Sequence, residues 1–224
     1  MNQPLVVEVN GLPGAGSTTL ARALTKCFGV VALTDAPAGD APPDLLVRVV
    51  GAQVRSADTA AIAMTEAPIL VVASKCDTRR ADQRPSAPGR QVYPVSGLLA
   101  GLTVTQEDVE LLSEWQRGGL VVPVVAAAFA EHPEQARLLA AYGRWGLARA
   151  MTAVAEQPGI DAQALTAHLR AASGIDALAP PIRALSGQIA ARRRAHRLSG
   201  LRLLAARGFD RTAAEYRLAA ESLR

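Results

Sequence analysis

The sequence PLVVEVNGLPGAGSTTLARALTK, residues 4–26, joins two hydrophobic patterns of different period through a glycine-rich segment. Its first part is an apolar run over Leu5–Asn10, bounded by a proline and a glycine, which predicts a buried strand. Its last part places Leu20, Ala23 and Leu24 at the spacing of one helix face. The stretch therefore predicts strand, loop and helix in immediate succession, which is the building unit of a parallel α/β sheet.

The glycine-rich segment nearly matches the phosphate-binding pattern GxxxxGK[ST]. Ser17 stands where the pattern has its lysine, and Thr18 stands where it has the hydroxyl that binds magnesium. Glycines let backbone N–H groups surround a phosphate, and the following helix directs its positive end at the same anion. A glycine-rich turn that only packs a helix on a sheet is the alternative. The candidate phosphate-binding residues are Gly11, Gly14, Ala15, Gly16, Ser17, Thr18 and Thr19, with Thr18 the candidate metal ligand.

The next segments carry weaker signals for a nucleotide switch. A short strand is predicted over Val30–Leu33, and the proline-rich stretch 34–44 predicts a loop. Thr34 is a candidate switch threonine in this loop, although an ordinary loop threonine is the favoured interpretation. A further strand, Leu45–Gly51, ends without the aspartate of a DxxG motif, so that only Gly51 matches.

A second motif follows the predicted buried strand Ile69–Ala73. Ser74-Lys75-Cys76-Asp77 has the form [NST]KxD, in which the carboxylate accepts hydrogen bonds from guanine and the lysine stem packs along the base. The next predicted strand, Gln91–Val95, ends in Ser96-Gly97-Leu98, which is similar to the short motif whose backbone N–H contacts the guanine oxygen. The candidate base-binding residues are Lys75, Asp77, Ser96 and Gly97.

In this order, the motifs over residues 4–98 resemble the nucleotide-binding half of P-loop GTPases, in the style of actinobacterial GTPase-like proteins loosely related to dynamins. The resemblance implies a parallel sheet with right-handed crossovers and a guanine nucleotide at the carboxyl ends of the strands. It implies GTP or GDP as ligand, with Mg²⁺ on Thr18. The missing lysine and the missing DxxG aspartate predict weak or absent hydrolysis, as in a switch or scaffold. Alternatives are a pseudo-GTPase interaction module that binds no nucleotide, and a nucleoside kinase, which leaves SKCD unexplained.

Beyond the motifs the predicted elements are helical. TQEDVELLSEWQ, residues 105–116, predicts a well-capped helix, and 121–129 predicts a last strand or a helical link. Further helices are predicted from Pro133 onward, over 161–173, 175–207 and 210–223. Because 175–207 contains Pro180-Pro181, it is expected to form two helices or one that begins at Pro181. We expect a nucleotide-binding domain over 1–130 and a helical bundle over 131–224.

The helical region carries an apolar stripe formed by Tyr142, Trp145, Leu147 and Met151. Such a stripe is expected to dock on the nucleotide domain rather than stay exposed. A second copy of the chain is the competing partner. The region either completes the core, or binds a protein partner or itself.

Composition excludes several classes. The chain has 224 residues, a net charge of +4 and 50% hydrophobic residues, which is typical of a soluble globular protein. Its basicity comes from arginine without any nucleic-acid-binding motif, so a nucleic-acid partner is not expected. No membrane span or signal peptide is predicted, which favours a cytoplasmic location. Cys27 and Cys76 are expected to be buried free thiols.

Overall fold

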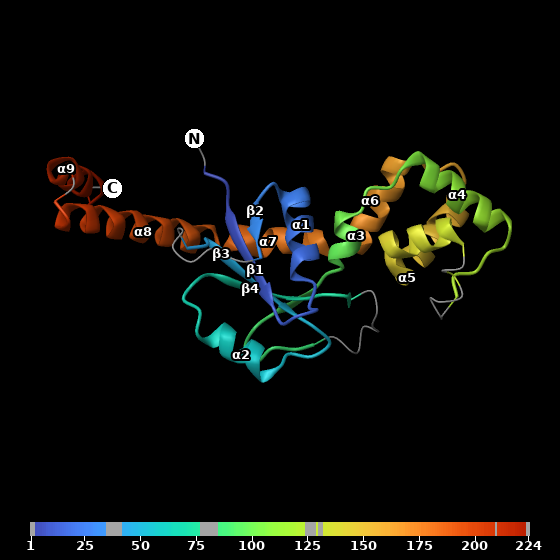
Figure 1. The fold of residues 1–224 in the computed structure, drawn as a ribbon, viewed down its shortest axis with the longest axis horizontal. Helices are drawn as coiled ribbons and strands as arrows, with labels where there is room; N and C mark the ends of the chain where they lie inside the picture. Colours follow the sequence, from blue (N-terminus) through green and yellow to red (C-terminus); the bar gives the residue numbers. More distant parts are fainter. Residues whose placement is uncertain are drawn as a thin grey trace.

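The computed structural model describes residues 3–34, 42–76, 85–123, 129, 132–208 and 210–222. These residues contain a five-stranded parallel sheet in the order β2-β1-β3-β4-β5 (Figure 1). The strands are β1 (Val6–Gly11), β2 (Val31–Leu33), β3 (Leu45–Val50), β4 (Ile69–Ala73) and β5 (Val92–Pro94). The predicted α/β class is confirmed, and every strand lies within one residue of its predicted bounds.

Helices surround the sheet and make up the C-terminal region. Thr105 caps α4 through the backbone N–H of Asp108, as its sequence predicts. The helices are α1 (Ser17–Phe28), α2 (Ser56–Ala63), α3 (Gly97–Gly101), α4 (Gln106–Arg117), α5 (Pro133–Glu156), α6 (Ala162–Ala172), the 3₁₀ helix η4 (Ile175–Leu178), α7 (Ala179–Ala184), α8 (Ser186–Ala206) and α9 (Arg211–Ser222). The predicted element 175–207 is thus divided near its proline pair. Val121–Pro123 forms neither strand nor helix, and 124–128 lie outside the described residues.

Side chains that alternate along β3 build different layers on the two faces of the sheet. Val47 and Val49 belong to the main core, which includes α1 and extends to Ile175 and Leu178 of η4. Arg48 lies on the opposite face, where it pairs with Asp58 of α2. In Figure 1, α1 and α2 accordingly lie on opposite sides of the sheet. The C-terminal region therefore completes the sheet's own core through η4.

The strand order defines where a ligand is expected to bind. The chain leaves β1 for β2 at one edge and then returns to the other side of β1 to form β3. In open α/β sheets, the crevice beyond the carboxyl ends of the strands at such a reversal is the usual binding site. The loops that follow β1 and β3 meet there, and the first is the glycine-rich segment.

The helices α4, α5 and α6 form a second core beside α3 (Figure 1). Tyr142, Leu147 and Met151 of the predicted stripe are buried in it, whereas Trp145 is only partly covered. A methyl group placed on Gly146 would lie 2.3 Å from Leu99 of α3, so α5 packs closely on α3. The stripe is therefore covered mainly by helices, and α3 connects these helices to α1.

Two carboxylates hold the helical elements in place. Arg193 of α8 donates to both oxygens of Asp44, at 2.6 and 2.5 Å, and Val6 N–H donates to Asp44 at 2.8 Å. Burial opposes ionisation of Asp44, but these hydrogen bonds outweigh it and lower its pKa. Asp108 of α4 accepts from Arg137 at 2.8 Å, and its pKa is likewise lowered against the effect of burial. Both carboxylates are therefore ionised at neutral pH.

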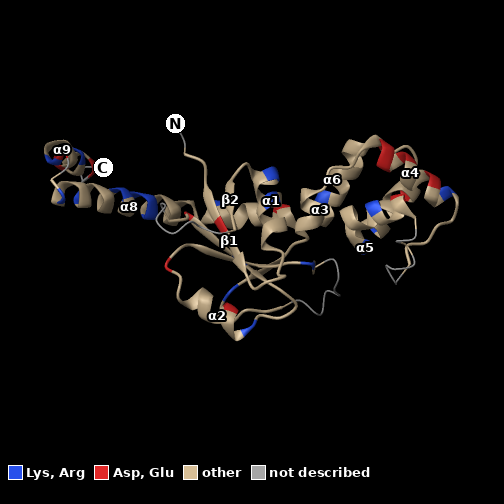
Figure 2. Ribbon diagram, in the orientation of Figure 1, with Lys and Arg blue, Asp and Glu red and all other residues tan. Residues whose placement is uncertain are grey.

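Beyond Arg193, α8 extends away from the sheet, and α9 folds back against α8 (Figure 1). Figure 2 shows the basic residues of α8, which include Arg192, Arg193, Arg194 and Arg197. Two of these arginines contact other parts of the protein. Arg193 pairs with Asp44, and Arg194 donates to the carbonyl of Glu221 at 2.5 Å. The basic run therefore partly fastens α8 to its neighbours.

Candidate functional site

The glycine-rich loop has the backbone conformation that its sequence predicts. Gly14 and Gly16 have φ angles of 77° and 91°, and Gly16 is the residue immediately before α1. Both values lie in the left-handed region that disfavours residues with a Cβ. The first turn of α1 receives no side-chain cap from Gly16, so Ser17, Thr18 and Thr19 present helix N-terminal N–H groups at this end of the sheet.

Ser17 lies beneath the loop. A methyl group placed on Gly11 would stand 2.7 Å from the carbonyl oxygen of Val49 and 2.9 Å from the hydroxyl oxygen of Ser17. The Ser17 side chain is thus close to the end of β1, where strands β1 and β3 pair. It occupies the lysine position of the motif but carries no charge.

The segment after β4 is fastened to this loop. The buried hydroxyl of Ser74 donates to the carbonyl oxygen of Ala15, and it lies 3.4 Å from that of Val50. Lys75 follows with a φ of 54°, unusual for a residue other than glycine, and its side chain is exposed. The structure therefore brings the first two residues of SKCD to the glycine-rich loop, while Asp77 lies outside the described residues.

The segment after β5 also reaches the loop. Ser96 caps α3 by accepting from Leu99 N–H, and its own N–H donates to the carbonyl of Ser173 at 2.8 Å. A methyl group on Gly97 would lie 3.1 Å from the backbone of Leu20, so α3 and α1 are in close contact. The Ser96 N–H thus already makes a hydrogen bond within the protein. Gly97 is the residue of this pair that faces α1.

A cavity of about 390 Å³ lies where these segments converge. This volume falls within the usual range of small-molecule sites, about 300–1,000 Å³. The sheet side contributes residues from the loops after β1, β4 and β5, and a fourth wall comes from the middle of α5. The lining residues are Gly16, Thr19, Leu20, Ser74, Lys75, Ser96, Gly97, Leu98, Gly143, Arg144 and Trp145.

A smaller cavity, about 160 Å³, lies on the other side of the loop. It occupies the crevice between β1 and β3 and is lined by loop residues Leu12–Ala15, by Gly51–Gln53 and by Arg55. Asp58 closes it from α2. The glycine-rich loop therefore separates two cavities at the carboxyl edge of the sheet.

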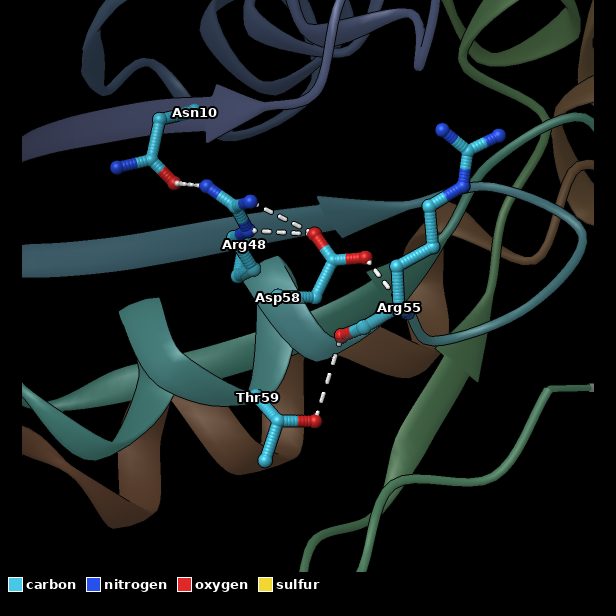
Figure 3. Close-up of polar contacts among 5 residues, drawn as sticks. All are labelled: Asn10, Arg48, Arg55, Asp58 and Thr59. Atoms are coloured by element: carbon cyan, nitrogen blue, oxygen red, sulfur yellow. Dashed lines mark hydrogen bonds and ion pairs between the residues drawn. The ribbon is translucent and has the colours of Figure 1, made fainter.

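An ion-pair network supports the floor of the smaller cavity (Figure 3). Arg48 donates to Asp58 through Nε at 2.9 Å and Nη2 at 2.7 Å, and to Asn10 at 3.3 Å. The other oxygen of Asp58 accepts from Arg55 N–H at 3.0 Å, at the start of α2. Arg48 is committed to this pair, so it is not available to replace the missing lysine. In Figure 3 the exposed side chain of Arg55 extends away from the pair.

The lysine and cysteine near the end of α1 have structural contacts. Lys26 donates to the carbonyl oxygens of Gly101 and Leu102, at 3.0 and 2.9 Å, and thereby caps α3. Cys27 donates to the carbonyl of Ala100 at 3.4 Å, and burial raises the pKa of its thiol. Neither Cys27 nor Cys76 is in a disulfide, as predicted, but both are partly exposed rather than buried.

Thr18 offers one hydroxyl oxygen, on an exposed position of the first turn of α1. Mg²⁺ needs six oxygen ligands and commonly takes most of them from phosphates and water. Over the described ranges, no group of three His, Cys, Asp or Glu side chains could hold a metal ion. The Thr18 hydroxyl could therefore contribute to a magnesium site only together with the oxygens of a bound phosphate.

Neither comparison with family models nor comparison with curated proteins gave a match. Among the candidate residues, those that line the larger cavity are Gly16, Thr19, Lys75, Ser96 and Gly97. Gly14 and Ala15 line the smaller cavity instead, and Gly11, Ser17 and Thr18 line neither of the two. Arg55, Arg144 and Trp145 were not predicted as site residues. In the part of the chain that the structure describes, every helix is too short or too polar to span a bilayer.

Proposed function

We propose that the chain is a guanine-nucleotide-binding protein of the P-loop type, with slow or no hydrolysis, that acts as a switch or scaffold. One observation carries this proposal. Three segments far apart in the sequence, each singled out for nucleotide recognition, line one cavity of about 390 Å³, which lies on the other side of the glycine-rich loop from the β1/β3 crevice. A glycine-rich turn that served only to pack α1 would need no such cavity.

The arrangement supports a definite orientation of the ligand. The phosphates would lie at the first turn of α1, because the N–H groups of residues 16–19 and the positive helix end attract anions. Mg²⁺ would bind the phosphates and the Thr18 hydroxyl. The base would lie between Lys75 and Gly97. The SKCD motif assigns the distinction of guanine from adenine to the carboxylate of Asp77.

The chemistry of the site favours binding over turnover. Ser17 lacks the charge that a P-loop lysine places on the β- and γ-phosphates, and Arg48 is held by Asp58. No aspartate precedes Gly51 at the spacing of DxxG. Loss of a single group that stabilises transition-state charge typically costs about 10²–10³ in rate. GTP hydrolysis is therefore expected to be undetectable or very slow.

Isothermal titration calorimetry of the full chain with GDP, GTP and ATP, each with Mg²⁺, tests the proposal. We expect both guanine nucleotides to bind with similar affinity and ATP to give no measurable heat. Equal weak binding of ATP and GTP would contradict guanine recognition. A folded chain that binds none of the three would instead favour the interaction module without nucleotide.

A further inference from the structure

The wall that α5 contributes to the larger cavity suggests a part of the site that no motif contains. Gly143 interrupts α5 with φ 65° and ψ 164°, a non-helical conformation inside a helix of 24 residues. Before this break Tyr142 is turned toward α4, where its hydroxyl donates to Asp108 at 3.2 Å. After it, Arg144 and Trp145 line the cavity beside the loops. The break therefore lets one helix serve the helical core and the cavity.

We propose that α5 completes the nucleotide site, with Trp145 stacking on the base and Arg144 supplying the positive charge that Ser17 cannot. This inference rests on the proposed function and names two ligand-contacting residues that the chain's motifs do not predict. Because both residues come from α5, ligand binding would also affect the helical region to which α5 belongs.

The indole of Trp145 is suited to stacking. Trp145 is the one aromatic residue among those that line this cavity in the described part of the chain, and its side chain is only partly covered. Arg149 lies 4.9 Å from the centre of its ring, so a cation already occupies one side of the indole and restrains it. Stacking of a base on an aromatic side chain is worth about 1–3 kcal/mol.

Charge supports a phosphate contact for Arg144. The cationic side chains among the described residues that line the larger cavity are Lys75 and Arg144, and the motif assigns Lys75 to the base. A nucleoside diphosphate carries several negative charges, and backbone N–H groups provide only partial positive charge. Arg144 is exposed, and a guanidinium can bind phosphate oxygens in bidentate fashion.

The chain holds a matched pair of tryptophans for a fluorescence test. Trp115 packs edge-on against Phe129 in the helical core, with ring centres 5.7 Å apart, and it does not line the cavity. Titration of GDP with Mg²⁺ into Trp115→Phe should quench the emission that remains, which comes from Trp145. The same titration into Trp145→Phe should leave the emission of Trp115 unchanged.

Affinity provides the second readout. Trp145→Ala should weaken GDP binding about fivefold to 150-fold, the range that corresponds to the stacking energy. Arg144→Gln should weaken GDP but not guanosine, and Arg144→Lys should restore part of the loss. Arg117→Gln, which changes an exposed arginine of α4 outside the cavity, is the control and should bind like the natural chain.

The outcomes separate this inference from the proposed function. If the natural chain binds GDP while the Trp145 emission and the affinities of the Trp145 and Arg144 variants stay within twofold, α5 does not contact the ligand and the inference is wrong, although the function stands. If the natural chain binds no nucleotide, both fail. If Trp145→Ala does not fold, the fluorescence of Trp115→Phe still decides.

Discussion

Replacing Asp58 with leucine should strongly destabilise the sheet, because it leaves the guanidinium of Arg48 buried without its partner. The two side chains are only 2% and 9% exposed, and Asp58 receives two hydrogen bonds from Arg48. Only the longer bond from Arg48 to Asn10, at 3.3 Å, would remain. Removing one member of a buried ion pair costs about 3–5 kcal/mol.

The double variant Arg48→Met/Asp58→Leu separates the buried charge from the other contributions. Replacing both members of a buried pair with apolar side chains is often neutral or stabilising. What remains lost is the bond from Arg55 N–H to Asp58, a helix-capping contact worth about 0.5–2 kcal/mol. The double variant should therefore be more stable than Asp58→Leu alone by about 1–4.5 kcal/mol, the difference between these two ranges.

Urea unfolding followed by circular dichroism measures these free energies. The natural chain, both single variants and the double variant form one thermodynamic cycle. Arg48→Met alone should also destabilise the fold, since it leaves the Asp58 carboxylate buried with only the Arg55 N–H. A cost below about 1 kcal/mol for Asp58→Leu would show that Arg48 does not depend on Asp58 for its burial, because this cost lies under the range for a buried pair. So would a double variant no more stable than Asp58→Leu.

Three further predictions concern the site and its supports. Ser17→Lys should strengthen GTP binding and raise phosphate release above that of the natural chain; robust release by the natural chain would show that its catalytic groups lie elsewhere. Asp77→Asn should shift preference from guanine to xanthine nucleotides in calorimetry, and an unchanged preference would remove Asp77 from the site. Because the pKa of Asp44 is lowered by its contacts, its stabilising effect should be present above its ordinary value of 3.8 and disappear as pH falls below it. Unfolding of Asp44→Asn should depend less on pH between 5 and about 2 than that of the natural chain, and equal pH dependence would contradict this assignment.

The sheet and its first helix could be predicted because local patterns specify them. The apolar run before Gly11 and the helical spacing after Gly16 need no information from distant residues. The same holds for the cap of α4, where Thr105 and Asp108 lie three residues apart. Glycines with positive φ stand in the loop where the motif requires them.

Contacts over long sequence separations could not be predicted in this way. Nothing local to Asp44 indicates that Arg193 will bind it, 149 residues later. Arg48 is the charged residue in the apolar run LLVRVV, so a buried partner could have been anticipated from the sequence. Its pairing with Asp58 became evident only from the position of α2 over that face of the sheet.

The sequence motifs likewise do not predict that α5 forms a wall of the cavity. Trp145 was assigned to an apolar helix stripe, and a continuous helix would have supported that assignment. Gly143 was the available signal, because glycine inside a helix is unfavourable by about 0.5–1 kcal/mol relative to alanine and often marks a break. The direction in which the break turns Trp145 depends on packing against α3 and α4, which the sequence pattern does not contain.

Hydrogen–deuterium exchange with and without GDP and Mg²⁺ tests most directly whether the convergent segments form one nucleotide site. If they do, GDP should slow exchange together in peptides covering residues 12–20, 74–76, 96–98 and 143–147. Peptides of α8 and α9, which line neither cavity beside the loop, should be unaffected. Unchanged exchange in the first three segments at saturating GDP, or protection confined to α8 and α9, would contradict the proposed site.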